Sequence, residues 1–168
     1  GLLSDAELYS RLLEAKVANP DVIGYLSIPG TDLHEPVVQT TDNVKYLTHA
    51  ADGDVDARGA IFADYRSPRY SGDSSRATLL HGHNMRDGSM FGVLASYGDA
   101  DFWADHPFIQ YVDAAGNGGT WLVYSAQQTD GSDDAFVFPV MRPYSDRVAR
   151  WADRSLLDSG FRPDLAGR

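Results

Sequence analysis

From residue 22 onward, the sequence consists of short apolar or β-branched stretches that are separated by turn residues. Such stretches predict β-strands, because branched and aromatic side chains are enriched in strands and Gly, Pro and Asn in turns. Pro29-Gly30 and the glycine-rich run 116–119 predict tight reversals, the second within a hairpin. Six strands with short connections predict a barrel or a sandwich. The predicted strands are 23–28, 36–39, 60–63, 77–81, 108–112 and 120–126.

Helices are expected only at the periphery of this mainly β fold. Ser4 and Glu7 have the spacing of a capping box, in which a hydroxyl and a carboxylate satisfy N–H groups at a helix start. Leu8 and Leu12 lie on one stripe of the predicted helix, and Pro20 ends it. Shorter helical pieces are predicted at 43–47 and 91–97, and an amphipathic helix at 143–159.

The composition limits what such a domain can bind. The chain has 168 residues, which is typical of one globular domain with its own hydrophobic core. Its formal net charge is −10, which gives no basic surface for nucleic acid or for anionic lipid headgroups. It contains no cysteine, so these residues can form neither a disulfide nor a thiol nucleophile.

Two closely spaced histidines are candidates for chemistry. His81 and His83 would share one face of a strand that continues past His81, as in a metal-binding His-x-His pair. No third ligand follows at a familiar spacing, so we expect no metal. His83 can instead act as a general acid or base, because imidazole titrates near neutral pH. A Ser-His-Asp arrangement stays open, although the sequence has no Gly-x-Ser-x-Gly motif.

The stretch around these histidines resembles a known block. Residues 79–91 read Leu-Leu-His-Gly-His-Asn-Met-Arg-Asp-Gly-Ser-Met-Phe. This is similar to the histidine block of the sortases, and specifically of class B, in which an apolar strand leads into Gly-His-Asn-Met and then Asp-Gly-x-Met-Phe. Four further stretches resemble class B sortases in the same order, at 24–31, 36–39, 42–47 and 59–66. The resemblance covers nearly the whole chain.

The resemblance implies an eight-stranded sortase β-barrel, of which this chain supplies about six strands. Residues 1–168 then form a single domain, with an N-terminal helix at 1–20, barrel strands at 21–127 and a class B-type helical connection after the sixth strand at 128–168. The last two strands of the family barrel would follow Arg168. We expect either a sequence that is incomplete here, a shortened inactive relative, or a barrel completed by a second chain, and we favour the first.

The resemblance also implies a cysteine transpeptidase. Such an enzyme cleaves the sorting signal of a secreted protein, holds the acyl fragment as a thioester and passes it to a cell-wall or pilin amine. No cofactor is implied. The location implied is the extracellular face of the membrane of a Gram-positive type cell. We expect the chain to be inactive as it stands, because it has no cysteine. The alternative is a non-catalytic sortase-like scaffold that binds peptide or a wall protein.

Only some of the family's functional residues have a match in this chain. The catalytic histidine matches His83, whereas the family's cysteine and arginine match no residue of this chain. His81 stands where the family usually has an apolar or tyrosyl side chain, which suggests packing. The peptide groove of class B enzymes implies substrate contacts at Leu47, with Asn43 as its organiser, and at Phe136. For these three residues, ordinary packing is the alternative.

Overall fold

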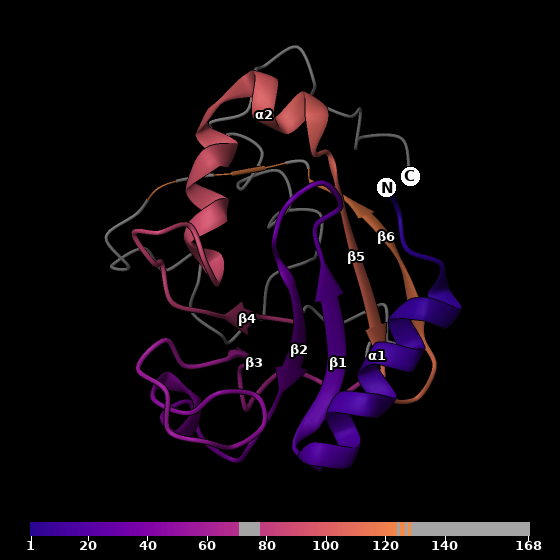
Figure 1. The fold of residues 1–168 in the computed structure, drawn as a ribbon, viewed down its shortest axis with the longest axis vertical. Helices are drawn as coiled ribbons and strands as arrows, with labels where there is room; N and C mark the ends of the chain where they lie inside the picture. The colour runs from indigo at the N-terminus through magenta and orange to yellow at the C-terminus, as the bar shows by residue number, and fades with distance from the viewer. Residues whose placement is uncertain (71–77, 124, 127, 129–168) are drawn as a thin grey trace.

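The computed structural model describes residues 1–70, 78–123, 125, 126 and 128. These residues form one six-stranded sheet in the order β4-β3-β2-β1-β5-β6, with helices along its faces (Figure 1). The elements are α1 (Asp5–Ala18), β1 (Val22–Ser27), β2 (His34–Val38), η1 (Lys45–Leu47), β3 (Ile61–Ala63), β4 (Leu80–His81), η2 (Phe91–Gly98), α2 (Ala100–Asp105), β5 (Phe108–Asp113) and β6 (Gly118–Leu122), where η marks a 3₁₀-helix.

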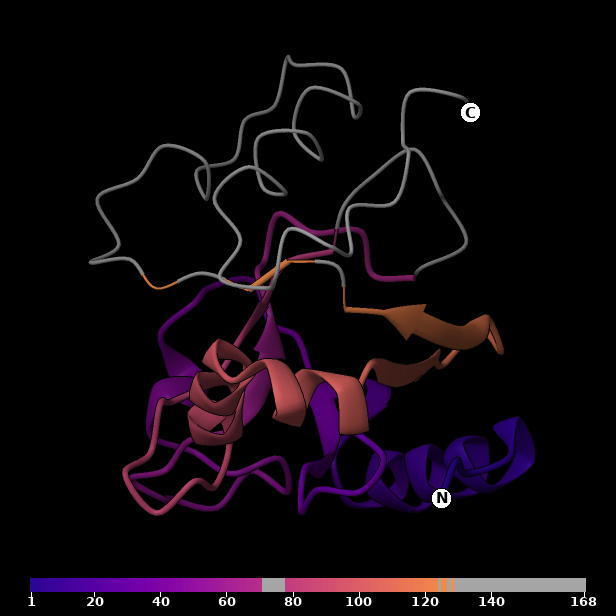
Figure 2. The same cartoon turned by 90° about the horizontal axis from the view of Figure 1, so that it is seen from above.

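Strand pairing combines antiparallel neighbours with one parallel pair. Strand β1 is central and runs antiparallel to both β2 and β5, and β5 pairs with β6 in a hairpin. Strand β3 runs parallel to β2, and β4 closes this side as an antiparallel neighbour of β3. Seen from above, the strands follow a curve rather than a flat row (Figure 2). The described strands therefore form a curled half-barrel, which confirms the predicted mainly β fold.

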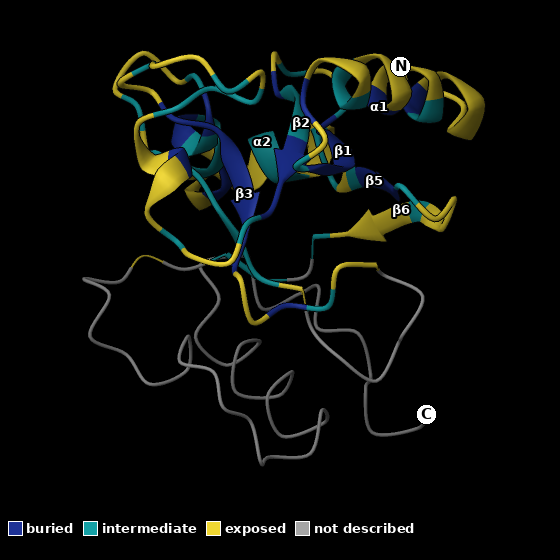
Figure 3. Ribbon diagram, turned by 90° about the horizontal axis from the view of Figure 1, so that it is seen from below, coloured by how far each residue is buried: buried dark blue, intermediate teal, exposed yellow. Residues whose placement is uncertain are grey.

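Side-chain alternation along the strands divides the core between the two faces of the sheet. One face buries Ile23, Val37 and Ile61 beneath η2, α2 and the loop that precedes η2. The other face buries Val22 and Val38, together with Leu8 and Leu12 of α1. Strands β1 and β3 are buried along their whole length and β2 at its last two residues, whereas β6 is largely exposed (Figure 3).

The N-terminal helix forms as the sequence predicts. The Ser4 hydroxyl accepts a hydrogen bond from the Glu7 N–H at 3.2 Å, and the Glu7 carboxylate accepts one from the Ser4 N–H at 2.8 Å. This reciprocal capping satisfies N–H groups that lack partners in the first turn. Leu8 and Leu12, one helical turn apart, are both fully buried against the sheet. The helix ends at Ala18, just before Asn19-Pro20.

Each predicted strand matches one strand of the sheet, four of them to within two residues at each end and two with a larger difference. Of the strand predicted at 77–81, the described residues form a strand at Leu80–His81, which pairs with the last two residues of β3. The strand predicted at 120–126 is shifted to Gly118–Leu122, where it pairs with β5. Helix α2 was not predicted; Asp99 caps it by accepting hydrogen bonds from the N–H groups of residues 101 and 102.

Two predicted features lie outside the described residues, namely the helix at 143–159 and Phe136. The division into 1–20, 21–127 and 128–168 stays a prediction for the same reason. Within the part that the structure describes, no helix has the length and apolar character needed to cross a bilayer.

Candidate active site

A groove of ≈ 780 Å³ lies beside the short strand β4. It runs between η1 on one side and the start of η2 on the other, so segments far apart in the sequence form its walls. Most of its lining is apolar, with a few polar side chains, as is typical of sites that hold an organic ligand. The lining residues are Asn43, Leu47, Phe62, Leu79, Leu80, His81, Gly82, His83 and Phe91.

His83 lies just beyond the end of β4. The strand ends at His81, so His81 and His83 do not share one face of a continuous strand. The backbone carbonyl of His83 accepts a hydrogen bond from the Phe91 N–H at 2.9 Å, which ties it to the start of η2. Its Nε2 atom is buried and has no hydrogen-bond partner among the residues that the structure describes. A buried imidazole nitrogen without a partner is costly, and such atoms mark sites of function or of a missing partner.

Gly82 allows this arrangement, because a side chain would not fit there. A Cβ at Gly82 would lie 2.5 Å from Cδ1 of Ile61 and 2.9 Å from the ring of Phe91. The backbone of this segment therefore packs directly on the core. His83 follows at the point where the chain leaves that contact and enters the loop.

The loop between His83 and η2 is closed by short-range contacts. Asn84 and Met90 form an isolated antiparallel bridge. The Asp87 carboxylate accepts hydrogen bonds from the Ser89 N–H at 3.0 Å and from its hydroxyl at 2.6 Å. Gly88 has a φ of +81°, a conformation that favours glycine. The motif that carries the family resemblance thus folds into a compact loop that holds His83 at the groove.

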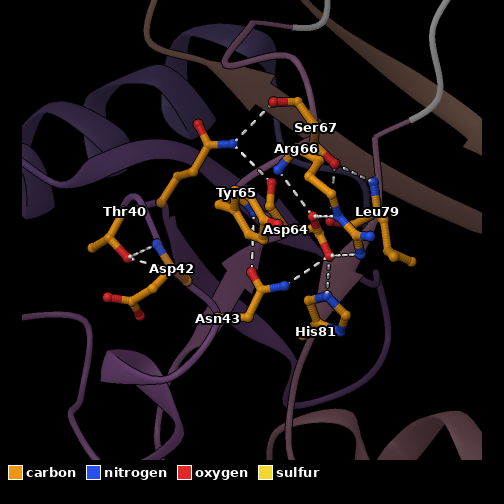
Figure 4. Close-up of polar contacts among 10 residues, drawn as sticks. Thr40, Asp42, Asn43, Asp64, Tyr65, Arg66, Ser67, Leu79 and His81 are labelled. Carbon is orange, nitrogen blue, oxygen red and sulfur yellow. Dashed lines mark hydrogen bonds and ion pairs between the residues drawn. The ribbon is translucent and has the colours of Figure 1, made fainter. Parts of the chain in front are cut away.

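Asp64 is a fully buried carboxylate behind the groove wall, at the end of β3 (Figure 4). Arg66 binds it through two side-chain nitrogens, each at 2.8 Å, and through its backbone N–H at 2.9 Å. Asn43 Nδ2 donates to Asp64 Oδ2 at 2.8 Å, and His81 Nε2 lies 3.1 Å from the same oxygen. Hydrogen bonds from Arg66 hold the pKa of the Asp64 carboxyl far below its usual range. Asp64 is therefore ionised at neutral pH.

His81 lines the groove with its side chain partly exposed. Its ring packs against Phe62, with the two ring centroids 5.0 Å apart. This contact agrees with the packing role expected for His81. The hydrogen bond to Asp64 was not predicted, and it gives the imidazole a fixed polar partner as well.

The opposite wall of the groove is anchored to α1. The buried Tyr46 hydroxyl accepts a hydrogen bond from Asn19 Nδ2 at 2.6 Å and donates one to Asp21 Oδ2 at 2.8 Å. Lys45 forms an ion pair with the same Asp21 oxygen at 2.8 Å. These contacts fix η1 against the C-terminal end of α1, and Leu47 is the last residue of η1.

The structure brings three of the four predicted site residues together. His83, Leu47 and Asn43 line one groove, and their roles in binding or catalysis stay predictions. Asp64 was missed, although the polar Asp-Tyr-Arg that directly follows the apolar strand 60–63 offered a signal. In the described part of the chain, no group of three or more acidic or histidine side chains is arranged to hold a metal ion.

Comparison with known proteins places this fold among the sortases. No protein-family model matches the chain. Sortase B of Listeria monocytogenes is 36% identical over 113 residues, which are 67% of this chain and 45% of that protein. Sortase B of Staphylococcus aureus is 31% identical over 116 residues, which are 69% of this chain and 46% of that protein. The chain thus spans about half the length of these curated relatives.

Solved structures agree with the sequence comparison. A Staphylococcus aureus sortase B–substrate complex has a TM-score of 0.79 at 24% identity, over 93% of this chain and 72% of that one. Spy0129, a Streptococcus pyogenes class B sortase involved in pilus biogenesis, has a TM-score of 0.78 at 22% identity, over 92% and 82%. A Bacillus anthracis protein similar to sortase B has a TM-score of 0.76 at 27% identity, over 91% and 71%.

The half-barrel with a histidine loop at the end of β4 defines a sortase-type domain. Both curated relatives and all three of these solved structures are sortase B proteins, class B sortases or similar to them. The chain is a class B-like sortase.

Proposed function

We propose that the groove beside β4 binds the sorting-signal peptide of a secreted protein and that His83 is the general acid and base of a transpeptidation reaction. One observation carries the proposal: His83 Nε2 is buried at the groove, and within the described part of the chain it has no hydrogen-bond partner. Such a nitrogen is suited to exchange a proton with a group that arrives with the substrate or the nucleophile.

The chemistry requires a thiolate, because the acyl fragment is held as a thioester between two half-reactions. In the first half-reaction, the cysteine sulfur attacks the scissile carbonyl carbon, and the imidazolium donates a proton to the departing amine nitrogen. In the second, the neutral imidazole takes a proton from the incoming amine as that amine attacks the thioester and the thiolate leaves. The 168 residues supply the imidazole and the groove, and the cysteine must come from outside them.

Relatives support the choice of partners. One solved relative is a Staphylococcus aureus sortase B–substrate complex, and another is a sortase B complexed with triglycine. We therefore propose a peptide substrate and a cell-wall or pilin amine as acceptor. We propose the outer face of the cell membrane as its location, because secreted proteins and wall amines meet there.

The proposal can be tested in two forms of the protein. The 168-residue chain is titrated by calorimetry with a pool of sorting-signal peptides from secreted proteins of the same genome, and we expect binding without cleavage. The product of the complete gene is then assayed for cleavage of the peptides that bind. We expect cleavage that a thiol alkylator abolishes.

His83→Ala should lower the cleavage rate at least about 100-fold, since general acid–base help contributes about 10²- to 10⁴-fold. His106→Gln is the matched control, because His106 packs on Phe102 outside the groove. Cleavage by the His83 variant at the parental rate, with thermal melts that show it is folded, would refute the catalytic assignment.

The absence of cysteine favours a second candidate function, a non-catalytic peptide-binding scaffold. The same two assays separate the candidates. Peptide binding by the complete gene product without any cleavage supports the scaffold, whereas alkylation-sensitive cleavage supports the enzyme.

A further inference from the structure

The polar side chains of the groove share one buried partner. Asn43, His81 and His83 are the polar side chains among the groove's lining residues, and two of them are bound by Asp64. Both of those hydrogen bonds end on the same oxygen, Oδ2. A fully buried carboxylate can hold its donors in one geometry, because no solvent competes for its oxygens.

The hydrogen bond to Asp64 determines which ring nitrogen of His81 carries a proton. An ionised carboxylate only accepts hydrogen bonds, so the His81 nitrogen that faces Asp64 must be an N–H donor. That nitrogen is Nε2, at 3.1 Å. In the neutral imidazole, Nδ1 is then an acceptor. Figure 4 shows this second ring nitrogen pointing away from Asp64.

Two further contacts keep the ring in this position. The Phe62 ring packs against the face of the imidazole at 5.0 Å between centroids and with an interplanar angle of 34°. Asn43, the other donor to Asp64 Oδ2, is itself fixed, because its Oδ1 accepts a hydrogen bond from the Tyr65 N–H at 3.0 Å. Asn43 and His81 thus share Asp64 Oδ2, and each side chain has a second contact of its own.

We propose that Asp64 is a positioning residue that aims His81 Nδ1 into the groove as a hydrogen-bond acceptor, and that this acceptor selects peptides with an N–H or O–H donor side chain. Apolar residues make up most of the remaining lining, so few other groups can satisfy such a donor. A donor-bearing peptide gains a hydrogen bond there, whereas an apolar analogue leaves a desolvated nitrogen without a partner. The selectivity rests on the proposed function of the groove, while the positioning of His81 does not.

The positioning is tested on the chain without any ligand. Long-range ¹H–¹⁵N NMR spectra at about pH 8, above the ordinary imidazole pKa, report which ring nitrogen of each histidine is protonated. We expect His81 to be protonated at Nε2 alone. Asp64→Asn should yield a mixture of tautomers, because an amide can donate as well as accept. Asp56→Asn is the matched control, since Asp56 makes a surface ion pair with Arg58.

Two results would overturn the positioning. One is a His81 ring protonated at Nδ1 in the parent chain. The other is an unchanged His81 tautomer in a folded Asp64→Asn variant. If Asp64→Asn does not fold, His81→Phe replaces it in the binding test, because that substitution keeps the ring contact with Phe62 and removes both nitrogens.

The selectivity is tested with the sorting-signal peptides described above, synthesised as pairs that differ by Thr against Val or by Gln against Met at one position. For the pair whose varied side chain meets His81, we expect the donor-bearing member to bind about three- to tenfold more tightly, the effect of one hydrogen bond. Asp64→Asn and His81→Phe should both remove the difference. Equal binding of both members of every pair by the parent chain refutes the selectivity. Binding of none of the peptides refutes the proposed function instead.

Discussion

Replacing Gly92 by alanine tests whether contact between η2 and the preceding loop holds His83 at the groove. Gly92 is the second residue of η2, and a Cβ there would overlap the Met85 carbonyl oxygen and lie 3.2 Å from the Met85 carbonyl carbon and nitrogen. Backbone atoms cannot turn aside as a flexible side chain can, so the loop must move by a distance on the order of 1 Å. The same Met85 oxygen accepts a hydrogen bond from the Gly88 N–H at 3.1 Å, which this movement strains.

Overpacking of this kind costs about 1–3 kcal/mol, and a weakened hydrogen bond adds about 0.5–1.5 kcal/mol. We therefore expect Gly92→Ala to lower the free energy of unfolding by about 1.5–4.5 kcal/mol. For a domain of this size, that corresponds to a fall in Tm of about 3–18 °C. Because the loop leads directly from His83 to η2, the variant should also lower cleavage by the complete gene product.

The assay is thermal and urea unfolding followed by circular dichroism, with Gly98→Ala as the control. Gly98 ends the same 3₁₀-helix, and a Cβ there would meet no atom within 4 Å. Its substitution should change the free energy of unfolding by less than about 0.5 kcal/mol or stabilise the chain slightly. If the two variants melt alike, close packing of Met85 on Gly92 does not fix the loop and the reasoning is wrong.

Three further substitutions test individual contacts through urea unfolding. The pKa of Asp64 is lower in the folded chain than in the unfolded chain, where it is near 4, so the ionised carboxylate stabilises the fold above that pH. This stability is lost as the pH falls below about 4 toward the folded-state pKa. Asp64→Asn should therefore reduce the pH dependence of the free energy of unfolding between pH 7 and about pH 3. Ser4→Ala should lower the free energy of unfolding by about 0.5–2 kcal/mol, because it removes the capping box. Ser10→Ala within the same helix should not lower it measurably. Tyr46→Phe should cost about 1–2 kcal/mol, since its buried hydroxyl joins two polar partners, whereas Tyr70→Phe on the surface should change little.

Local sequence signals predicted the elements of this fold well, because their physical causes are local. The capping box at Ser4 needs only a hydroxyl and a carboxylate three residues apart, and both are visible in the sequence. The β5–β6 hairpin likewise turns at Gly116, which has a φ of +85°. Helix α2 was missed because its six residues directly follow η2, with only the cap Asp99 between them.

The contacts that build the groove could not be predicted in this way. Asp64 meets Asn43 and His81 from 21 and 17 positions away, and sequence periodicity carries no information on such distances. The motif around His83 predicted a functional loop, but the motif does not show that Nε2 of His83 is buried without a partner among the described residues. The sequence therefore indicated which residues are candidates, and the sheet determines which of them meet.

The two walls of the groove depend on opposite faces of the sheet. Leu47 is held through Tyr46, which packs with α1 on one face, whereas His83 is held through its hydrogen bond to Phe91, which packs on the other. A change that loosens the contact of Tyr46 with α1 should therefore weaken peptide binding and leave the chemistry of bound peptide nearly intact. A change in the loop before η2 should slow the chemistry of bound peptide and leave peptide binding nearly intact, because it moves the imidazole and leaves the Leu47 wall in place. Asp64 lies behind the groove wall and binds Asn43 and His81. Its substitution should therefore affect which peptide the groove selects.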